Sequence, residues 1–325
     1  MHGIELTPEH PTERLVDLAV DAEREGFEAV LLASHYFNRD PFVVADRIAR
    51  ATDEVLVGPA AANPYDAHPV ALASRVGTLA EGRDDRALFG LGPGDRSTLS
   101  DLAVERDRPL RRVLETMQVA RRLFAGEAVD HDGTFQASGA ELEYDIGTVP
   151  VYVGAQGPHM TRMAGKYADG VLFNGSHPAD LAWASERVAE GREERADSLD
   201  APELLAYASV SVAADEAAAR EAARPPVAFI AGGAAPPVLS RHGIDEDAAA
   251  TVGTRLEDGD YRAAFDAVTP AMLDAFAAAG TPETVAQRLA GLLDHADGVL
   301  VGAPLGPDLE TAVGLAGEAL ELATE

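Results

Sequence analysis

A carboxylate inside the first apolar segment is the side chain best suited to acid–base chemistry. Glu5 lies between Ile4 and Leu6 in the run 3–6. A carboxylate among apolar neighbours is costly unless it is paired or protonated. Burial raises the pKa of such a group, which suits a general acid near neutral pH. A structural glutamate paired with an arginine explains the position equally well, so both interpretations stay open.

Two more polar side chains follow other apolar segments. Asp95 comes directly after the glycine-rich stretch 90–94, where an aspartate can also cap the next helix. His35 follows the second apolar run, and a histidine in such a place is more often packed or hydrogen-bonded than catalytic. Both residues are candidates whose structural interpretation has to be weighed beside the chemical one.

Loops rich in glycine and polar residues follow six of the apolar runs. These loops are 34–36, 58–65, 90–95, 154–158, 174–178 and 302–307. Glycine lets a backbone approach a ligand closely. The loops 154–158 and 174–178 each precede an expected helix N-terminus, which favours a phosphate-bearing ligand. Any one loop is explained by ordinary turn residues, but six on one rim indicate a binding site.

The segments that position these loops alternate between two kinds. Eight short apolar runs read as strands, at 3–6, 29–34, 55–60, 86–92, 151–155, 170–174, 204–213 and 298–304. Uninterrupted apolar runs are typical of parallel strands buried on both faces. Amphipathic segments between them predict helices at 12–26, 41–52, 69–82, 109–126, 158–170, 178–195, 215–223 and 307–322.

Eight strands with intervening helices predict a (β/α)8 TIM barrel, a fold whose active site lies at the carboxyl ends of the strands. A doubly wound sheet is the alternative, because alternation alone does not show closure. We expect one domain over residues 1–325. Two insertions interrupt it, at about 93–150 and 226–296. The first should contain a small β excursion near 131–145.

Composition excludes several classes of function. With 55 acidic against 26 basic residues the net charge is −29, which argues against nucleic-acid binding. The absence of cysteine excludes disulfides, thiolate metal sites and a cysteine nucleophile. No apolar run reaches the roughly 18 residues of a membrane span, and the N-terminus does not resemble a signal peptide. We therefore expect a cytoplasmic protein.

The acidic residues are spread along helical segments and do not form a tail. The chain has a single lysine, Lys166. In molar salt the Debye length shrinks to roughly 3 Å, which screens the repulsion between carboxylates. A dispersed acidic surface also keeps a protein soluble in brine. These observations favour an organism that accumulates salt in its cytoplasm over an ordinary acidic protein.

Several familiar catalytic motifs are absent from the sequence. It contains no GxxxxGK[ST] phosphate loop, no GxSxG elbow and no HExxH zinc motif. The segment 90–94 matches a dinucleotide fingerprint only superficially. The histidines are scattered singly, so no metal site is expected.

Taken in order, several segments carry a resemblance to a known family. They are GIEL (3–6), SHY (34–36), GPAAANPY (58–65), LGPGD (91–95), VYVGAQGP (151–158), DGVLFNGSHP (169–178), PPVAFIAGGAAPPVLSRHGI (225–244) and GVLVGAPLGPD (298–308). Together they closely resemble the methylenetetrahydromethanopterin reductases, the coenzyme F420-dependent branch of the bacterial-luciferase-like barrels. The acidic surface adds the expectation of a haloarchaeal member.

The resemblance implies a reduced deazaflavin, F420, at the carboxyl mouth of the barrel. It implies a non-proline cis peptide near Ala60–Ala61, a catalytic acid at Glu5 and a supporting acid at Asp95. Expected coenzyme-binding residues are His35, Ala60, Ala61, Asn63, Gly154, Ala155, Gln156, Gly157, Asn174 and Ser176. One position departs from the family, because Ser34 stands where its members usually have aspartate, and this puts a catalytic use of His35 in question.

The implied reaction is hydride transfer from reduced F420 to a methylene-tetrahydropterin, with Glu5 as proton donor. The substrate is a derivative of either tetrahydromethanopterin or tetrahydrofolate. The high-salt interpretation slightly favours tetrahydrofolate. Two alternatives remain, an FMN-dependent luciferase-like monooxygenase and a non-catalytic barrel that only binds F420. The Ala- and Val-rich helices 41–52 and 69–82 are expected to pair two or more copies of the chain.

Overall fold

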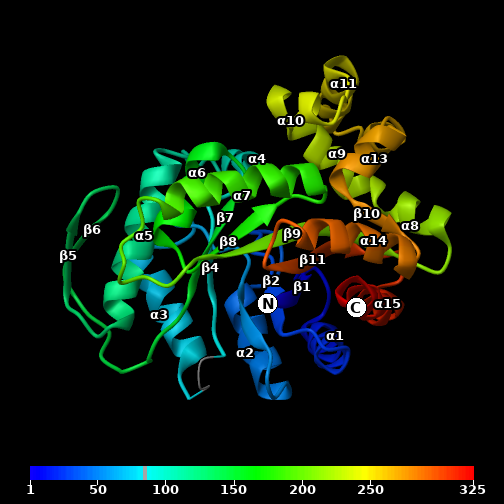
Figure 1. Cartoon of the computed structure of the whole chain (residues 1–325). Helices are drawn as coiled ribbons and strands as arrows, with labels where there is room; N and C mark the ends of the chain where they lie inside the picture. The colour runs from blue at the N-terminus through cyan, green and yellow to red at the C-terminus, as the bar shows by residue number, and fades with distance from the viewer. Residues whose placement is uncertain (83–85) are drawn as a thin grey trace. The chain divides into compact units, whose positions relative to one another are not determined.

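The computed structural model describes residues 1–82 and 86–325, and these fall into two units (Figure 1). The first unit contains residues 1–173 and 184–205. The second contains residues 174–183 and 206–325. The single domain expected from the sequence stays a prediction, and each unit has its own arrangement of strands and helices.

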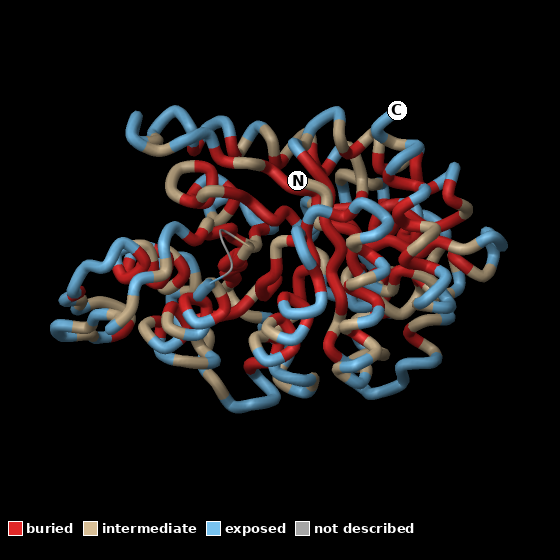
Figure 2. Tube along the Cα trace, turned by 90° about the horizontal axis from the view of Figure 1, so that it is seen from below, coloured by how far each residue is buried: buried red, intermediate tan, exposed pale blue. Residues whose placement is uncertain are grey.

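Parallel strands form the centre of the first unit. They are β1 (His2–Leu6), β2 (Ala29–Leu32), β3 (Leu56–Pro59), β4 (Phe89–Leu91), β7 (Val151–Ala155) and β8 (Gly170–Asn174). Ladders join β1 to β2, β2 to β3, β4 to β7 and β7 to β8. Bridges between Val57 and Ala87 and between Ala62 and Leu91 complete the order. The residues of these strands are mostly buried, which explains their unbroken apolar character. Figure 2 shows buried residues gathered in the interior of the molecule and exposed ones around its outside.

Two glycines allow β3 and β4 to approach each other. A Cβ on Gly58 would lie 2.0 Å from the carbonyl oxygen of Leu88. A Cβ on Gly90 would lie 2.0 Å from the carbonyl oxygen of Pro59. No other residue fits at either position without moving the backbone. The loops that follow β3 and β4 are therefore held close together.

Helices follow the strands of the first unit, and all of them except α4 lie where the sequence pattern predicts. They are α1 (Thr12–Arg24), α2 (Pro41–Ala51), α3 (Pro69–Ala80), α4 (Arg96–Asp101), α5 (Pro109–Phe124) and α6 (Pro158–Tyr167), while α7 (Pro178–Arg192) begins in the second unit and ends in the first. Gly26, at φ +85°, ends the segment of α1 in the left-handed conformation that glycine tolerates. The Asp40 carboxylate caps α2 by accepting hydrogen bonds from the amides of Phe42 and Val43.

A hairpin forms the predicted β excursion. It consists of β5 (Val129–Asp132) and β6 (Gln136–Ala140), paired antiparallel. Glu115 of α5, whose side chain is 10% exposed, holds the turn. Its carboxylate accepts from the amide and hydroxyl of Thr134, both at 2.6 Å, and from Arg111 at 2.6 Å. Burial alone would raise the pKa of Glu115, but these hydrogen bonds and one from His131 lower it to about 2.

Replacing Glu115 by glutamine should reduce the free energy of unfolding by about 2 kcal/mol near neutral pH, because charged hydrogen bonds to a buried group are lost. The ionised carboxylate stabilises the fold fully above its ordinary pKa of 4.5, and this contribution disappears as the pH falls towards about 2. Denaturant titration of wild type and Glu115→Gln at several pH values should therefore show a difference in the free energy of unfolding. This difference should shrink as the pH falls from 4.5 towards about 2.

Glu127→Gln is the matched control, because Glu127 pairs with Arg122 at 2.8 Å on the surface and is 54% exposed. Its effect should stay within about 0.5 kcal/mol. If Glu115→Gln changes stability no more than Glu127→Gln, the hairpin does not depend on the buried carboxylate.

The second unit contributes the remaining strands. Here β9 (Glu203–Val212), which starts in the first unit, pairs with β11 (Gly298–Leu305) and with the short parallel strand β10 (Ala278–Gly280). The helices are α8 (Glu216–Ala222), α9 (Arg224–Gly233), α10 (Pro236–Arg241), α11 (Glu246–Glu257), α12 (Tyr261–Asp266), α13 (Pro270–Phe276), α14 (Pro282–Leu293) and α15 (Leu309–Thr324). Sequence analysis missed β10, because two alanines and a glycine give no strand pattern.

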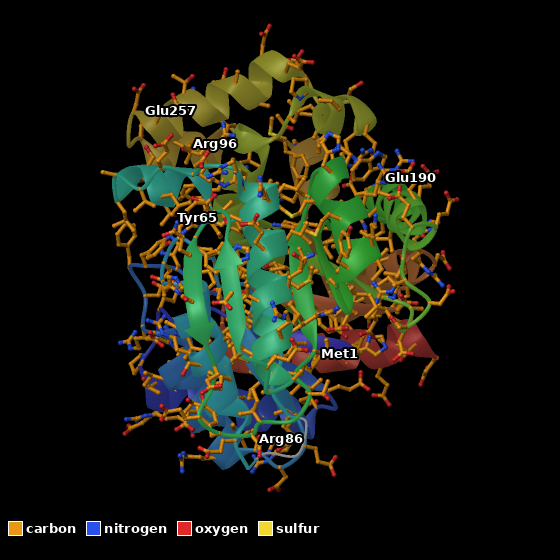
Figure 3. The ribbon with its side chains drawn as sticks, turned by 90° about the vertical axis from the view of Figure 1, so that its left-hand side faces the viewer. Met1, Tyr65, Arg86, Arg96, Glu190 and Glu257 are labelled. Atoms are coloured by element: carbon orange, nitrogen blue, oxygen red, sulfur yellow. The ribbon has the colours of Figure 1, made fainter. Side chains whose placement is uncertain are left out.

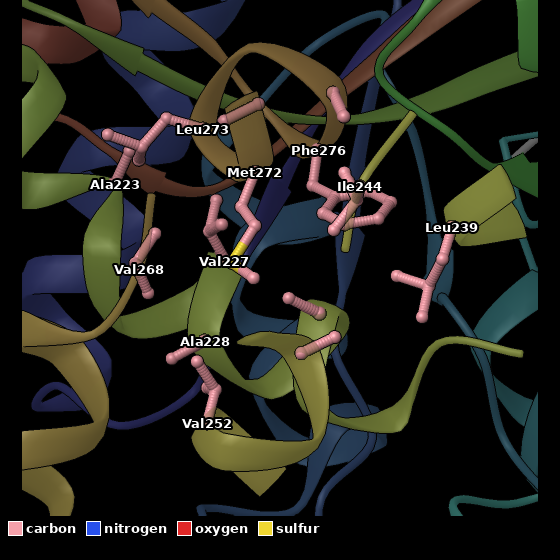
Figure 4. Packing of buried hydrophobic residues seen from close by; sticks show 14 of the residues in the cluster. Ala223, Val227, Ala228, Leu239, Ile244, Val252, Val268, Met272, Leu273 and Phe276 are labelled. Carbon is pink, nitrogen blue, oxygen red and sulfur yellow. The ribbon is translucent and has the colours of Figure 1, made fainter. Parts of the chain in front are cut away.

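The predicted insertion 226–296 has its own apolar core. Helices α9 to α13 pack around a cluster of buried side chains that includes Val227, Leu239, Val252, Met272 and Phe276 (Figure 4). Val227 and Met272 are fully buried. This core explains why the insertion folds into several short helices, since each helix buries one apolar face.

All eight predicted strands are present, as β1, β2, β3, β4, β7, β8, β9 and β11, with helices between them. The fold is the predicted α/β (β/α)8 barrel with insertions. Strand positions agree with the apolar runs to within three residues at either end. The carboxyl ends of the strands carry the loops in which the candidate residues lie.

Candidate active site

Glu5 is a buried carboxylate near the carboxyl end of β1. Its side chain is 2% exposed, and in the sheet register it stands beside Leu31 of β2. The hydroxyl of Thr7 donates a 3.0 Å hydrogen bond to Glu5 Oε1. This bond fixes the orientation of the carboxyl group. The structure thus confirms that Glu5 is a buried carboxylate, while its role as an acid stays a prediction.

A chain of hydrogen bonds links the loop after β2 to the loop after β4. The Thr98 hydroxyl donates a hydrogen bond to Asp95 Oδ2 at 2.8 Å, so its oxygen can accept one from His35 Nε2 at 3.3 Å. The His35 Nδ1 lies 3.5 Å from the backbone amide of Phe37, which donates to it. His35 and Asp95 are brought together through Thr98.

Asp95 is the N-cap of α4. Its Oδ2 also accepts from the amide of Thr98 at 2.7 Å, as a helix cap does. The capping interpretation of this residue is confirmed. Capping does not prevent Asp95 from also supporting Glu5 electrostatically, and that second role stays a prediction.

Asn63 organises the loop after β3. It is 4% exposed, and its Oδ1 accepts from the hydroxyl of Tyr36 at 3.0 Å, the amide of Tyr65 at 3.0 Å and the amide of Asp66 at 3.1 Å. Burial raises the pKa of the Tyr36 phenol, which stays a hydrogen-bond donor. With its oxygen engaged, Asn63 would offer a ligand the hydrogens of its amide nitrogen.

Small residues surround the start of the same loop. The Ala60–Ala61 peptide bond is cis, as the resemblance implies. The Cβ of Ala61 lies 3.2 Å from where a Cβ on Gly92 would stand and 3.8 Å from one on Gly154. Around Gly157 a Cβ would meet no atom within 4 Å. Small side chains and bare backbone therefore line the start of this loop.

The remaining predicted residues differ in exposure. Ala155 is buried at the end of β7, and Gln156 is exposed just before α6. In the second unit, the side chain of Asn174 is exposed, whereas Ser176 is only 3% exposed. The hydroxyl oxygen of Ser176 accepts a 2.9 Å hydrogen bond from the backbone amide of Ser209. Coenzyme binding by these residues stays a prediction.

The family model described as "Luciferase-like monooxygenase" matches residues 2–297. The chain belongs to the luciferase-like family. Its named relatives include a 5,10-methylenetetrahydromethanopterin reductase of Archaeoglobus fulgidus, 38% identical over 97% of both chains. Another reductase of that name, from Methanolobus tindarius, is 37% identical over 97% of this chain and 98% of its own length.

Solved structures agree with this luciferase-like assignment. The coenzyme F420-dependent tetrahydromethanopterin reductase of Methanopyrus kandleri superposes with a TM-score of 0.90 at 34% identity, over 97% of this chain and 96% of that one. An F420-dependent secondary alcohol dehydrogenase bound to an F420–acetone adduct has a TM-score of 0.81 at 18% identity. The second likeness shows the shared fold alone.

Sequence analysis missed a buried ionic cluster in this luciferase-like chain. Asp180 is 4% exposed, accepts from His242 Nε2 at 2.8 Å and is hydrogen-bonded to Arg241. Burial opposes ionisation, but these two partners lower the pKa of Asp180 below its ordinary value. The ring of His242 lies 4.8 Å from that of His177. The segment Arg241–His242–Gly243 belongs to the family resemblance, but no sequence signal links it to Asp180, which lies 62 residues from His242.

Within residues 1–82 and 86–325, no group of three or more histidine, aspartate or glutamate side chains is arranged to hold a metal ion. Over the same ranges, no helix has both the length and the apolar character needed to cross a membrane.

Two substitutions of Asp95 test its capping role directly. Asp95→Ala should lower the protection of the Thr98 amide against hydrogen exchange and reduce stability by about 1 kcal/mol, whereas Asp95→Asn should retain both, because asparagine caps helices equally well. Exchange rates measured by NMR distinguish the variants. Equal protection in wild type and Asp95→Ala would mean that α4 does not need the cap.

Proposed function

We propose that the protein is a coenzyme F420-dependent methylene-tetrahydropterin reductase. The observation that carries the proposal is the buried Glu5 carboxyl at the end of β1, oriented by Thr7 at 3.0 Å. Relatives named 5,10-methylenetetrahydromethanopterin reductase, aligned over nearly the whole chain, support it. The reaction converts a methylene-tetrahydropterin into its methyl form.

The residues around Ala61 fit a flat ring system. Gly92 and Gly154 have no side chain to obstruct it, and a Cβ at position 92 would stand only 3.2 Å from the Ala61 methyl, which would have to shift slightly. Ala60, Ala61, Asn63 and Gly157 would hold the coenzyme through backbone and amide groups. When bound, reduced F420 supplies a hydride.

The protein's own groups would position and protonate the substrate. Glu5 would hold a proton at its buried carboxyl and donate it to the pterin nitrogen as the one-carbon bridge opens. Thr7 keeps that carboxyl in one orientation. Because the reacting rings have only to be held face to face, proximity supplies much of the rate. Asp95 would support the acid electrostatically from the loop after β4.

Glu5→Gln should lower kcat by about a hundredfold or more, because glutamine cannot donate the proton. The affinity for reduced F420, measured by fluorescence titration, should stay within about twofold, since the exchange is isosteric. Glu13→Gln on the exposed face of α1 is the control and should keep wild-type turnover. Turnover unchanged in Glu5→Gln would refute the role of Glu5.

The proposal also includes the identity of the pterin that carries the one-carbon group. The named relatives act on a tetrahydromethanopterin derivative, as their names print. We favour methylene-tetrahydrofolate, because the acidic, lysine-poor surface indicates a salt-accumulating cell, which need not be a methanogen. Comparison of kcat/KM for the two methylene pterins at several KCl concentrations decides between them.

The cellular setting follows from the same surface. We propose a cytoplasmic protein of a haloarchaeon that forms a homodimer or larger homo-oligomer. The exposed Val43 on α2, with 59% of its surface accessible, supports pairing through α2 and α3. Such pairing needs salt, because two chains of −29 repel each other in dilute buffer.

Thermal unfolding should show the effect of salt directly. The exposed Glu13, Asp17 and Asp21 succeed each other at four-residue spacing on α1, where like charges repel. Molar KCl screens this repulsion, so Tm should be clearly higher there than in dilute buffer. Sucrose, which carries no charge, is the control for general osmotic effects. Equal Tm values in dilute buffer and in molar KCl would contradict the high-salt interpretation.

A further inference from the structure

Three side chains of the first unit form one continuous chain of hydrogen bonds at the carboxyl ends of β2 and β4. Thr98 lies in the middle of this chain and is 6% exposed. His35 and Asp95, at its two ends, are exposed. Figure 3 shows Arg96, the first residue of α4, at the end of the strands opposite to Met1. The chain therefore lies at the end of the strands where the candidate loops are found.

Thr98 holds one oxygen of the Asp95 carboxylate with two donors. Its hydroxyl donates to Oδ2 at 2.8 Å, and its amide donates to the same oxygen at 2.7 Å. An exposed aspartate populates several side-chain rotamers unless donors hold its carboxylate. Thr98 therefore fixes the direction in which Asp95 presents its carboxylate.

Both ring nitrogens of His35 have partners within the protein. Nε2 lies 3.3 Å from the Thr98 hydroxyl, and Nδ1 accepts from the amide of Phe37 at 3.5 Å. The single hydrogen of the Thr98 hydroxyl is donated to Asp95, so its oxygen is left to accept from Nε2. A ligand that used either nitrogen of His35 would have to displace one of these partners.

The loop that carries His35 is held by its neighbours on both sides. The hydroxyl of Tyr36 donates to Asn63 Oδ1 at 3.0 Å, in the loop after β3. The guanidinium of Arg39 donates to the carbonyl of Glu9 at 2.8 Å, in the loop after β1. These bonds keep the imidazole of His35 at a fixed place beside α4.

The helix cap does not account for the Thr98 hydroxyl. Capping of α4 uses the amide of Thr98, which any residue at this position would supply. The next residue, Leu99, is fully buried and anchors α4 on its own. The hydroxyl is thus an additional contact, and it joins the carboxylate of Asp95 to the imidazole of His35.

We propose that His35 and Thr98 are positioning residues for Asp95, with His35 acting through Thr98 and not by contact with the coenzyme or substrate. The inference rests on the proposed function, in which Asp95 supports the proton donor Glu5. Each member of the chain donates to the next, and hydrogen bonds in such a chain strengthen one another. A carboxylate held in one orientation supports the reaction better than one that rotates.

Removal of the hydroxyl alone tests the role of Thr98. Thr98→Val keeps the amide of the cap and should lower kcat about tenfold, because Asp95 is no longer held in place. The Kd for reduced F420, measured by fluorescence titration, should stay within about twofold, since no coenzyme contact is removed. Thr98→Ser retains the hydroxyl and should restore kcat to within about twofold of wild type.

Thr52→Val is the matched control. Thr52 is 4% exposed, and its hydroxyl donates to the carbonyl of Ile48 at 2.9 Å at the end of α2. This substitution removes a hydroxyl of similar burial that lies before β3 and should keep the kcat of wild type. Circular dichroism checks that each variant is folded. Equal kcat values in Thr98→Val and Thr52→Val would overturn the proposal.

A double-mutant cycle shows whether His35 acts through Thr98. His35→Phe retains a ring beside Phe37, which lies 5.2 Å away edge-on, but removes the Nε2 donor. It should lower kcat about threefold in wild type and cause no further loss in Thr98→Val, because residues that act as one unit are not additive. Losses that multiply, or a raised Kd for reduced F420 in His35→Phe, would mean direct ligand contact and would overturn the proposal.

The chain can also be detected without turnover in the full-length, ligand-free protein. The ¹⁵N resonance of His35 Nε2, assigned with His35→Phe, should change in Thr98→Val and stay in place in Thr98→Ser and Thr52→Val. An unchanged resonance in Thr98→Val would overturn the chain. The expected resonances in a wild type that oxidises reduced F420 with neither pterin would keep the chain and refute the proposed function.

Discussion

The burial of one carboxylate in an apolar strand is the constraint on which the account depends. Glu5 is 2% exposed, so it is removed from water almost completely. Such a group is tolerated when a neighbouring donor orients it, as Thr7 does at 3.0 Å. Gly58 and Gly90 bring β3 and β4 together, so the loops that follow these two strands lie close to each other. The barrel thus supplies a buried carboxylate and, after β3 and β4, loops made of small residues.

Much of this arrangement was predictable because it depends on local pattern. Parallel strands need uninterrupted apolar runs, so all eight appear in the sequence, and Asp95 after a glycine-rich turn already indicated a helix cap. The cis bond at Ala60–Ala61 was predictable only from the family resemblance. Contacts between distant segments were not predictable. Thr134 with Glu115, and His242 with Asp180, are 19 and 62 residues apart and have no local signal.

Charge is distributed at two scales in this molecule. Over the whole chain, carboxylates outnumber basic residues by 55 to 26, which suits a crowded ionic solvent. At the ends of β3 and β4, arginines bonded to loop carbonyls oppose that trend. Arg106 and Arg112 donate to the carbonyl oxygens of Pro93 and Pro64, so hydrogen bonds within the loops hold these two side chains.

The most direct test of the central claim is anaerobic oxidation of reduced F420 by the purified protein in molar KCl. The account predicts that the absorbance of oxidised F420 appears only after methylene-tetrahydrofolate or methylene-tetrahydromethanopterin is added, with one methyl product formed per coenzyme oxidised. Oxidation that requires oxygen and FMN in place of a pterin, or no oxidation with either pterin at any salt concentration, would contradict it.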